Sequence, residues 1–345
     1  MNIHLASPTY PATQGTPPSE QQEASVIEAD EIGVGTTPST GNRLAVLLAT
    51  YQGERFIDEQ LSSIEAQSWT HIDIWASDDG SSDGTLGVLA RWARRWRRGK
   101  FVVLSGPDRG FADNFRSLMI NPEVDADYVC FCDQDDIWLK DKTRAAASIL
   151  ARSGDRPALY CARTIIADEW GHEFDRSPLF RRPPEFSNAL VQSIGGGNTM
   201  VMNRAAHRLM REAARRTGFV SHDWFSYLIV TGAGGDVTYS ETPHVRYRQH
   251  AGNLVGSNHG LKAQMRRILA AFGGRFRRWN EENVAALEAC RDLLTPESLA
   301  TFEAFRRART APLRERIASL KRSGVYRQSR IGQISLYAAG LLGKL

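Results

Sequence analysis

A length of 345 residues suits one large α/β domain with appendages, and the composition, 42% hydrophobic and 24% charged, is that of a globular protein with a sizeable core. The formal net charge of +4 is small for this length and excludes a general nucleic-acid-binding character. No apolar stretch is long enough to cross a bilayer, no secretory signal pattern opens the chain, and four cysteines without CxxC spacing suit buried thiols, so we expect a cytoplasmic protein.

The N-terminal segment differs in composition from the rest of the chain. Residues 1–42 are rich in Pro, Thr, Ser, Gln and Glu and have little apolar periodicity, which predicts a disordered tail. From Leu44 onward, short apolar runs alternate with amphipathic stretches. This alternation predicts βαβ units and a mostly parallel central sheet flanked by helices, in a domain spanning 43–255.

The predicted elements follow in chain order. Strands are predicted at 44–49, 71–76, 101–104, 128–132, 158–164, up to Asn203, at 237–239 and at 245–248. Helices are predicted around 57–64, 86–96, 113–119 and 140–150, directly after Asn203, and from His222. From Leu261 the pattern is helical, with breaks near Gly273, Pro296 and Gly324, so we predict a C-terminal helical extension over 256–345.

Three polar loops follow predicted strands, at 50–53, 77–84 and 133–136. In an open α/β sheet, ligands bind at the carboxyl ends of the strands, so these loops are candidates for a ligand site. Acidic residues and glycines are also ordinary turn residues, so a purely structural role stays open for 77–84. A calcium loop opening at Asp79 is excluded, because its closing glutamate would fall at Ala90.

The loop at 133–136 holds three carboxylates within four residues, Asp133, Asp135 and Asp136, directly after an apolar strand. These charges repel one another unless a cation holds them. Mg²⁺ and Mn²⁺ prefer carboxylate oxygen and leave coordination positions for substrate phosphates. The loop therefore predicts a divalent metal site that neutralises a diphosphate leaving group.

The chain resembles family 2 of the glycosyltransferases, which have the GT-A fold, over about residues 44–253, and within it the bacterial rhamnosyltransferase-like members. The resemblance is carried by segments that occur in the same order, namely 49–54 (ATYQGE), 77–81 (SDDGS), 133–138 (DQDDIW), 222–224 (HDW) and 247–250 (YRQH). It implies an inverting transfer of a sugar from a nucleotide diphosphate donor, a dTDP- or UDP-sugar such as dTDP-L-rhamnose. The implied acceptor is a hydroxyl of a glycan or of a lipid-linked carrier in cell-surface polysaccharide synthesis.

The resemblance also implies which residues contact the nucleotide sugar. These are Thr50, Tyr51, Glu54, Asp78, Asp79, Arg109, Asn114, Asp133 and Gln134. Either Asp78 or Asp79 would accept a hydrogen bond from the N–H of a pyrimidine ring. Asp108 and Asp113 depart from the family pattern around Arg109 and Asn114, which weakens those two assignments.

Metal binding and catalysis fall on three residues. The resemblance implies that Asp135 holds the metal and that His250 completes the metal shell or contacts the diphosphate, although a structural histidine is the alternative. Asp223 is our candidate for the catalytic base, because a direct displacement needs one carboxylate to take the proton of the attacking hydroxyl. The competing interpretation makes Asp223 the N-cap of the helix that follows.

The acceptor site is expected around Gly197, Asn198, Thr199, His222 and Trp224. The glycine-rich segment would let an acceptor approach the backbone, or it is a plain tight turn. Trp224 is a candidate for stacking on a sugar ring, and burial in the core is the equal alternative.

The C-terminal segment is interpreted without the resemblance. The stretch 331–345 places Ile331, Ile334, Ala338, Leu341 and Leu345 on one side of a helix, and arginines precede it. This pattern suits a helix lying in the membrane interface, at the inner face of the plasma membrane, or a helix docked on protein.

Two other functions remain as alternatives. A sugar nucleotidyltransferase would need a glycine-rich loop with a basic residue after the first strand, and none is found there. A non-catalytic nucleotide-sugar-binding protein would have lost the metal carboxylate or the base, yet Asp135 and Asp223 are both present.

Overall fold

The computed structural model describes residues 42–250 and 275–345. The predicted N-terminal tail and the predicted helix at 261–272 therefore lie outside the described residues. Within them, every helix is too short or too polar to cross a bilayer.

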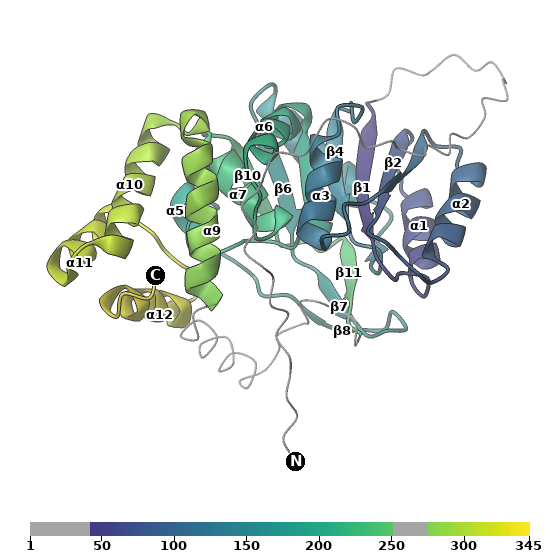
Figure 1. The fold of residues 1–345 in the computed structure, drawn as a ribbon. Helices are drawn as coiled ribbons and strands as arrows, with labels where there is room; N and C mark the ends of the chain where they lie inside the picture. Colours follow the sequence, from purple (N-terminus) through teal and green to yellow (C-terminus); the bar gives the residue numbers. More distant parts are fainter. Residues whose placement is uncertain (1–41, 251–274) are drawn as a thin grey trace.

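A seven-stranded sheet forms the centre of the molecule, in the order β10-β6-β9-β4-β1-β2-β3 (Figure 1). Its strands are β1 (Leu44–Thr50), β2 (Ile72–Asp78), β3 (Phe101–Ser105), β4 (Tyr128–Cys132), β6 (Ala158–Ala162), β9 (Val201–Asn203) and β10 (Asp236–Ser240). All neighbouring strands are parallel except where β9 pairs with β4 and β6. The mostly parallel sheet expected from the alternating pattern is confirmed.

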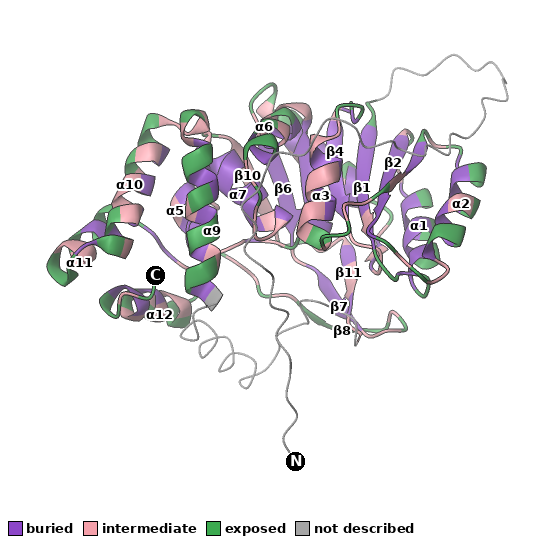
Figure 2. Ribbon diagram, in the orientation of Figure 1, coloured by how far each residue is buried: buried purple, intermediate pink, exposed green. Residues whose placement is uncertain are grey.

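Helices cover both faces of this sheet. Successive residues of β1 point to opposite faces, so alternate side chains pack against different helices. Leu44, Val46 and Leu48 pack in one core cluster with residues of α1 (Ile57–Glu65), α2 (Thr85–Arg95) and α4 (Lys142–Leu150). Ala45 and Leu47 pack in another with residues of α3 (Phe111–Ile120), α5 (Phe186–Ala189), α6 (Arg204–Arg216) and α7 (His222–Gly232). Strands β2, β4, β6 and β9 are buried along their whole length, whereas the edge strand β10 is only half-buried (Figure 2).

A second, four-stranded sheet has the order β5-β11-β7-β8. Its strands are β5 (Ile137–Trp138), β7 (Ile165–Ala167), β8 (Glu173–Arg176) and β11 (Val245–Arg248). The predicted extended run at 158–164 is observed as β6, which ends at Ala162 in the central sheet, and β7 begins beyond that run, at Ile165. β5 and β8 escaped prediction because two to four residues are too few to show an alternating pattern.

The C-terminal part is helical, as predicted, and packs on the same core cluster as α3, α6 and α7. It comprises α9 (Arg275–Ala289), α10 (Pro296–Thr310), α11 (Leu313–Arg322) and α12 (Arg330–Leu341). Leu287, Phe302 and Leu336 are almost fully buried in that cluster. Short 3₁₀ turns lie at η1 (Ala151–Ser153), η2 (Gly197–Thr199) and η3 (Arg291–Leu293).

Candidate active site

The three polar loops predicted from the sequence meet at one edge of the central sheet. They follow β4, β1 and β2, which are parallel neighbours, so their carboxyl ends lie side by side (Figure 1). In the pairing register Thr50 stands opposite Asp78, and Leu48 stands opposite Cys132. The positions that the sequence marked as polar therefore line one continuous edge.

Side chains of these loops brace one another. The side chain of Gln134 accepts from the backbone N–H of Tyr51 at 2.8 Å and donates to its carbonyl at 2.8 Å. The carboxylate of Glu54 accepts the backbone N–H of Gly84 at 2.9 Å, and the Tyr51 ring is exposed. Gln134 and Glu54 thus hold the loops in register, while Tyr51 is available to a ligand.

The two acids after β2 are both buried but have different partners. Asp78 accepts the hydroxyls of Thr50 and Ser81 at 2.8 and 2.7 Å, and the Ser81 N–H at 2.8 Å. Asp79 accepts the backbone N–H groups of Asp108 and Gly110, each at 2.7 Å. Since a carboxylate offers about four acceptor positions, Asp78 retains capacity for one more donor and Asp79 for two.

The loop held by Asp79 carries Arg109, whose side chain is exposed at the same edge. Asn114 lies behind it and is 1% exposed. Its amide donates to the carbonyl of Ser77 at 2.9 Å, so this side chain fastens α3 to β2. Its Oδ1 is buried without a hydrogen-bond partner among the described residues.

Three carboxylates face one another across the site. Burial raises the pKa of Asp133 to about 7, with further increases from the negative charges of Asp135 and Asp223. Asp223 belongs to α7 and the other two follow β4, so residues 90 positions apart in sequence are close in space. This arrangement concentrates negative charge, which a cation or a proton must offset.

Asp135 is paired with the histidine that the resemblance singled out. The distance between His250 Nε2 and Asp135 Oδ2 is 2.8 Å, and the His250 ring packs against Phe56 at 4.5 Å between centroids. Among the residues that the structure describes, no group of three or more His, Cys, Asp and Glu side chains is arranged to hold a metal alone. Two protein ligands nevertheless fit Mg²⁺ or Mn²⁺, which take their remaining ligands from phosphates and water.

Two further residues support the loop at 133–136, named the metal loop for its predicted role. Sequence reasoning assigned Arg248 no role and counted Asp136 among the carboxylates of the predicted metal site. The buried guanidinium of Arg248 donates to the carbonyls of Asp135 and Glu169 at 2.9 and 2.6 Å and to Glu59 at 2.6 Å. Asp136 is fully buried and accepts the side-chain amide of Asn198 at 2.6 Å. Both residues lie within the motifs that carry the family resemblance, but the sequence does not indicate that their side chains point inward.

Asp223 lies in the first turn of α7 without being its N-cap, which is Ser221. One of its oxygens accepts the Trp224 N–H at 2.7 Å, and the other is 3.4 Å from the Ser193 hydroxyl. The cap interpretation is therefore wrong by two positions, although the positive end of the helix still stabilises this carboxylate. The second oxygen is weakly held and remains able to accept a proton.

The residues expected at the acceptor site are mostly turned inward. Asn198 binds Asp136, Thr199 is 1% exposed, and the Trp224 ring is buried and donates to the Ala189 carbonyl at 2.6 Å. Stacking of Trp224 on a sugar ring is therefore not supported by its position. Gly197 is buried as well, and it lies against the His222 ring.

His222 occupies an apolar setting. Its ring lies 3.8 Å from the Phe115 ring and 4.6 Å from the Phe131 ring, between centroids. Burial lowers the pKa of His222 to about 4, so the ring is neutral at neutral pH. A Cβ added at Gly197 would lie 1.8 Å from His222 Nε2, which explains why this loop position needs glycine.

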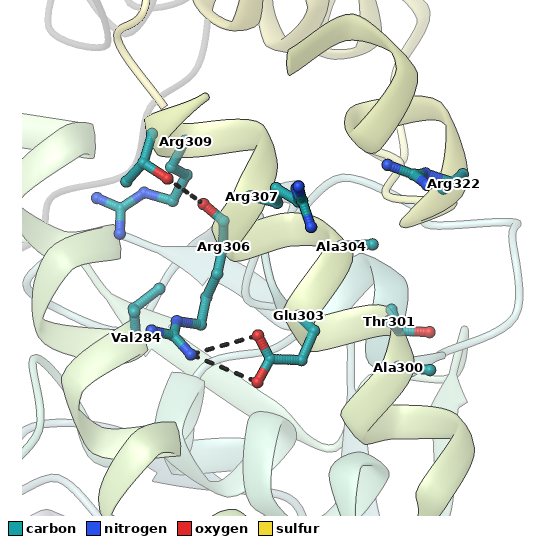
Figure 3. A pocket seen from close by; sticks show the side chains of 10 residues that line it. Val284, Ala300, Thr301, Glu303, Ala304, Arg306, Arg307, Arg309 and Arg322 are labelled. Carbon is teal, nitrogen blue, oxygen red and sulfur yellow. Dashed lines mark hydrogen bonds and ion pairs between the residues drawn. The ribbon is translucent and has the colours of Figure 1, made fainter. Parts of the chain in front are cut away.

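A hollow of about 930 Å³ lies elsewhere, between α9, α10 and α11 (Figure 3). Arginines line it, but Arg306 pairs with Glu303 and Glu288, and Arg307 pairs with Glu315. Its charges are thus largely compensated, and it contains none of the carboxylates described above.

Comparison with known proteins places these motifs in a family. A family model described as Glycosyl transferase family 2 matches residues 45–212. The dTDP-rhamnosyl transferase RfbG of Shigella flexneri is 30% identical over 230 residues, which cover 64% of this chain and 78% of the relative. The putative teichuronic acid biosynthesis glycosyltransferase TuaG of Bacillus subtilis is 28% identical over 190 residues, 54% of this chain and 71% of the relative.

The crystal structure of residues 1–349 of S. aureus TarS in complex with UDP is 15% identical, with 88% of each chain covered and a TM-score of 0.49.

Proposed function

Because the chain belongs to glycosyltransferase family 2, we propose that it transfers a sugar, with inversion at the anomeric carbon, from a nucleotide diphosphate donor to an acceptor hydroxyl. The α/β class with a C-terminal helical extension that was expected of a GT-A enzyme is the fold observed. The observation that carries the proposal is the meeting of Asp133, Asp135 and Asp223 at the carboxyl edge of the sheet.

The donor binds along that edge in this proposal. Thr50, Tyr51, Glu54 and the Asp78–Asp79 pair surround the base and ribose, and Arg109 reaches the diphosphate. Asp135 and His250 would hold Mg²⁺ or Mn²⁺, which supplies positive charge to the leaving diphosphate. Asp133 faces the donor sugar or ribose beside that charge.

Asp223 acts as general base. As the acceptor oxygen forms its bond to the anomeric carbon, the bond from that carbon to the phosphate oxygen breaks. The hydroxyl proton passes to Asp223, and the nucleoside diphosphate leaves. A single displacement of this kind requires no covalent enzyme intermediate, and the weakly held Asp223 oxygen is available for the proton.

The donor class follows from relatives. RfbG carries the name of a dTDP-rhamnosyl transferase and TuaG that of a teichuronic acid enzyme. We therefore propose a dTDP- or UDP-sugar, with dTDP-L-rhamnose as the first candidate, and an acceptor in cell-surface polysaccharide synthesis. A lipid-linked acceptor would place the enzyme at the cytoplasmic face of a membrane, in contact through its C-terminal helices.

The test is release of nucleoside diphosphate by the purified protein, with Mn²⁺ and a panel of donor sugars, in the presence and absence of simple acceptors. We expect one donor to turn over, Asp223→Asn to slow turnover by about 10²- to 10⁴-fold, and Asp135→Ala to lose the Mn²⁺ response. Asp155→Asn, which neutralises an exposed acid away from the site, is the matched control.

The outcomes separate the alternatives. Tight donor binding without any cleavage, with or without acceptors, would favour a non-catalytic nucleotide-sugar-binding protein. Pyrophosphate release from a nucleoside triphosphate and a sugar phosphate would favour a nucleotidyltransferase. Either result removes the transferase proposal.

A further inference from the structure

The last helix, α12, presents apolar side chains to solvent. Ile331, Ile334, Tyr337 and Leu341 recur at helical spacing and are 49%, 70%, 41% and 52% exposed. Leu342 follows at 61%, and the outer surface of α12 is exposed in Figure 2. We name these five residues the outer face of α12. A surface helix of a water-soluble protein ordinarily has polar residues on that side.

The opposite side of α12 is already used for packing. Leu336 is 1% exposed and belongs to the main core cluster, and Gly340 lies against the Leu320 side chain of α11. The helix is thus fixed to the protein by one apolar side, and its outer face is a second apolar side. Rotation of the helix cannot bury the outer face without exposing Leu336.

The charged side chains in the segment that contains α12 have one sign. From Arg316 to Leu345 the chain contains no Asp or Glu, but it contains Arg316, Lys321, Arg322, Arg327, Arg330 and Lys344. Arg330 is the first residue of α12 and Lys344 follows the helix, so exposed cations flank the outer face at both ends. Arg327 is turned inward to the Val191 carbonyl and takes no part in this surface.

From these observations we infer that α12 lies in the interfacial plane of an anionic phospholipid bilayer, with its outer face among the acyl chains and Arg330 and Lys344 at the headgroups. An apolar stripe with cations at its ends, in a segment without Asp or Glu, combines the two interactions that bind a helix to an anionic membrane. A second protein chain could cover the apolar stripe, but it would not explain why the segment 316–345 contains cations and no Asp or Glu. This membrane contact is part of the proposed function, but binding of α12 to the bilayer does not depend on the identity of the donor or the acceptor.

The experiment measures co-sedimentation of the full-length protein with vesicles of phosphatidylcholine alone or mixed with phosphatidylglycerol. We expect binding to the mixed vesicles that weakens at high salt and is much lower on phosphatidylcholine alone. The double variant Ile334→Glu/Leu341→Glu should lower the partition coefficient by about tenfold or more, because it places two charges in the acyl region. Leu86→Glu is the matched control, an equally exposed apolar residue on α2 at the other end of the molecule.

Three results would overturn the inference: no binding of the wild type to the mixed vesicles, equal binding of the double variant, or wild-type self-association in lipid-free sedimentation velocity that the double variant abolishes. The last would mean that a second copy covers the outer face. Donor cleavage in lipid-free buffer should be unchanged in the double variant. Failure of the transferase proposal would instead show as absent donor cleavage in every variant, with vesicle binding intact.

Discussion

At the scale of single residues, the site depends on side chains that never reach a substrate. Arg248 joins β11 to the metal loop through the Asp135 carbonyl and to α1 through Glu59. Its guanidinium makes three separate bonds in fixed directions, and its side chain is almost fully buried. The position of Asp135 is therefore set partly by a residue more than 100 positions away in sequence.

We expect Arg248→Lys to weaken the metal site while leaving the fold intact. A lysine ammonium is a point charge on a flexible stem and cannot hold all three oxygens at once. The apparent Mn²⁺ affinity in donor cleavage should fall by about 10- to 100-fold, as is usual when a group that orients metal ligands is lost.

Arg246→Lys is the control for this substitution. It changes the same residue type on the same strand, where Arg246 pairs with Glu173 at a part-exposed position. Exposed pairs contribute little, so Mn²⁺ affinity should be unchanged. Equal affinities of the Arg248→Lys protein and the wild type would show that Arg248 does not position Asp135.

At this scale the sequence predicted the positions of residues along the elements but not the directions of their side chains. Thr50, Asp78, Asp133 and Asp135 were predicted from their place after strands, and the structure brings them to one edge. For Trp224 the sequence left stacking on an acceptor sugar and burial in the core as equal alternatives, and the structure buries it. Residue type and spacing indicate where a residue falls along an element. They do not indicate whether its side chain points toward the ligand site or into the core.

At the scale of elements, the loop that contains η2 is shaped by its neighbour α7. His222 occupies the space beside Gly197, and Asn198 is held by Asp136. The glycine-rich segment was predicted as an acceptor loop or a plain turn. Its contacts show that it is clamped between the metal loop and the helix that carries Asp223, so movement of this loop would disturb both.

Gly197→Ala should therefore be costly. Its Cβ would overlap His222 Nε2, and relief of such a clash in a packed site typically costs about 1–3 kcal/mol. We expect a lower unfolding free energy together with slower donor cleavage, because the displaced ring lies next to Asp223. Urea unfolding and the diphosphate-release assay measure the two effects.

Gly87→Ala is the informative comparison. A Cβ at Gly87 in α2 meets nothing within 4 Å, and alanine is the better helix former by about 0.5–1 kcal/mol. That variant should be slightly more stable than the wild type. A neutral Gly197→Ala variant would mean that the His222 ring moves aside freely and that the loop is not clamped.

At the scale of the whole molecule, the catalytic domain and the C-terminal helices share one hydrophobic cluster. Phe115 of α3, Leu228 of α7 and Phe305 of α10 belong to it together. The predicted division into a domain at 43–255 and a helical region at 256–345 stays a prediction, and one hydrophobic cluster contains residues from both parts. The C-terminal helices therefore stabilise the site as well as extending the surface.

Stability of the whole chain should fall as the solution becomes acidic. Burial lowers the pKa of His207 to about 3, whereas the unfolded chain keeps a value near 6.5. Between about pH 6.5 and pH 3 the unfolded state therefore binds a proton at this residue and the folded state does not. The free energy of unfolding falls progressively as the pH drops below about 6.5. At pH 5, which lies about 1.5 pH units below the pKa of the unfolded histidine, protonation of the unfolded chain at this residue lowers the free energy of unfolding by about 2 kcal/mol.

His207→Gln removes this one contribution. The unfolding free energy of the variant, measured in urea at pH 7 and pH 5, should decline by about 2 kcal/mol less than that of the wild type. His222, with its own lowered pKa, stays in both proteins and cancels in the comparison. Identical declines in the two proteins would show that His207 is not excluded from protonation in the folded state.

The amino-acid sequence by itself determined the α/β class, the order of the main elements and the family, because hydrophobic periodicity and motifs such as Asp133–Asp135 are local patterns. Only the tertiary structure decided that Asp223 faces Asp133, that Asn114 and Trp224 turn inward, and that the outer face of α12 is exposed. The physical reason is that facing and burial depend on which elements pack together. That choice is made by contacts between residues far apart in the chain, which no local pattern records.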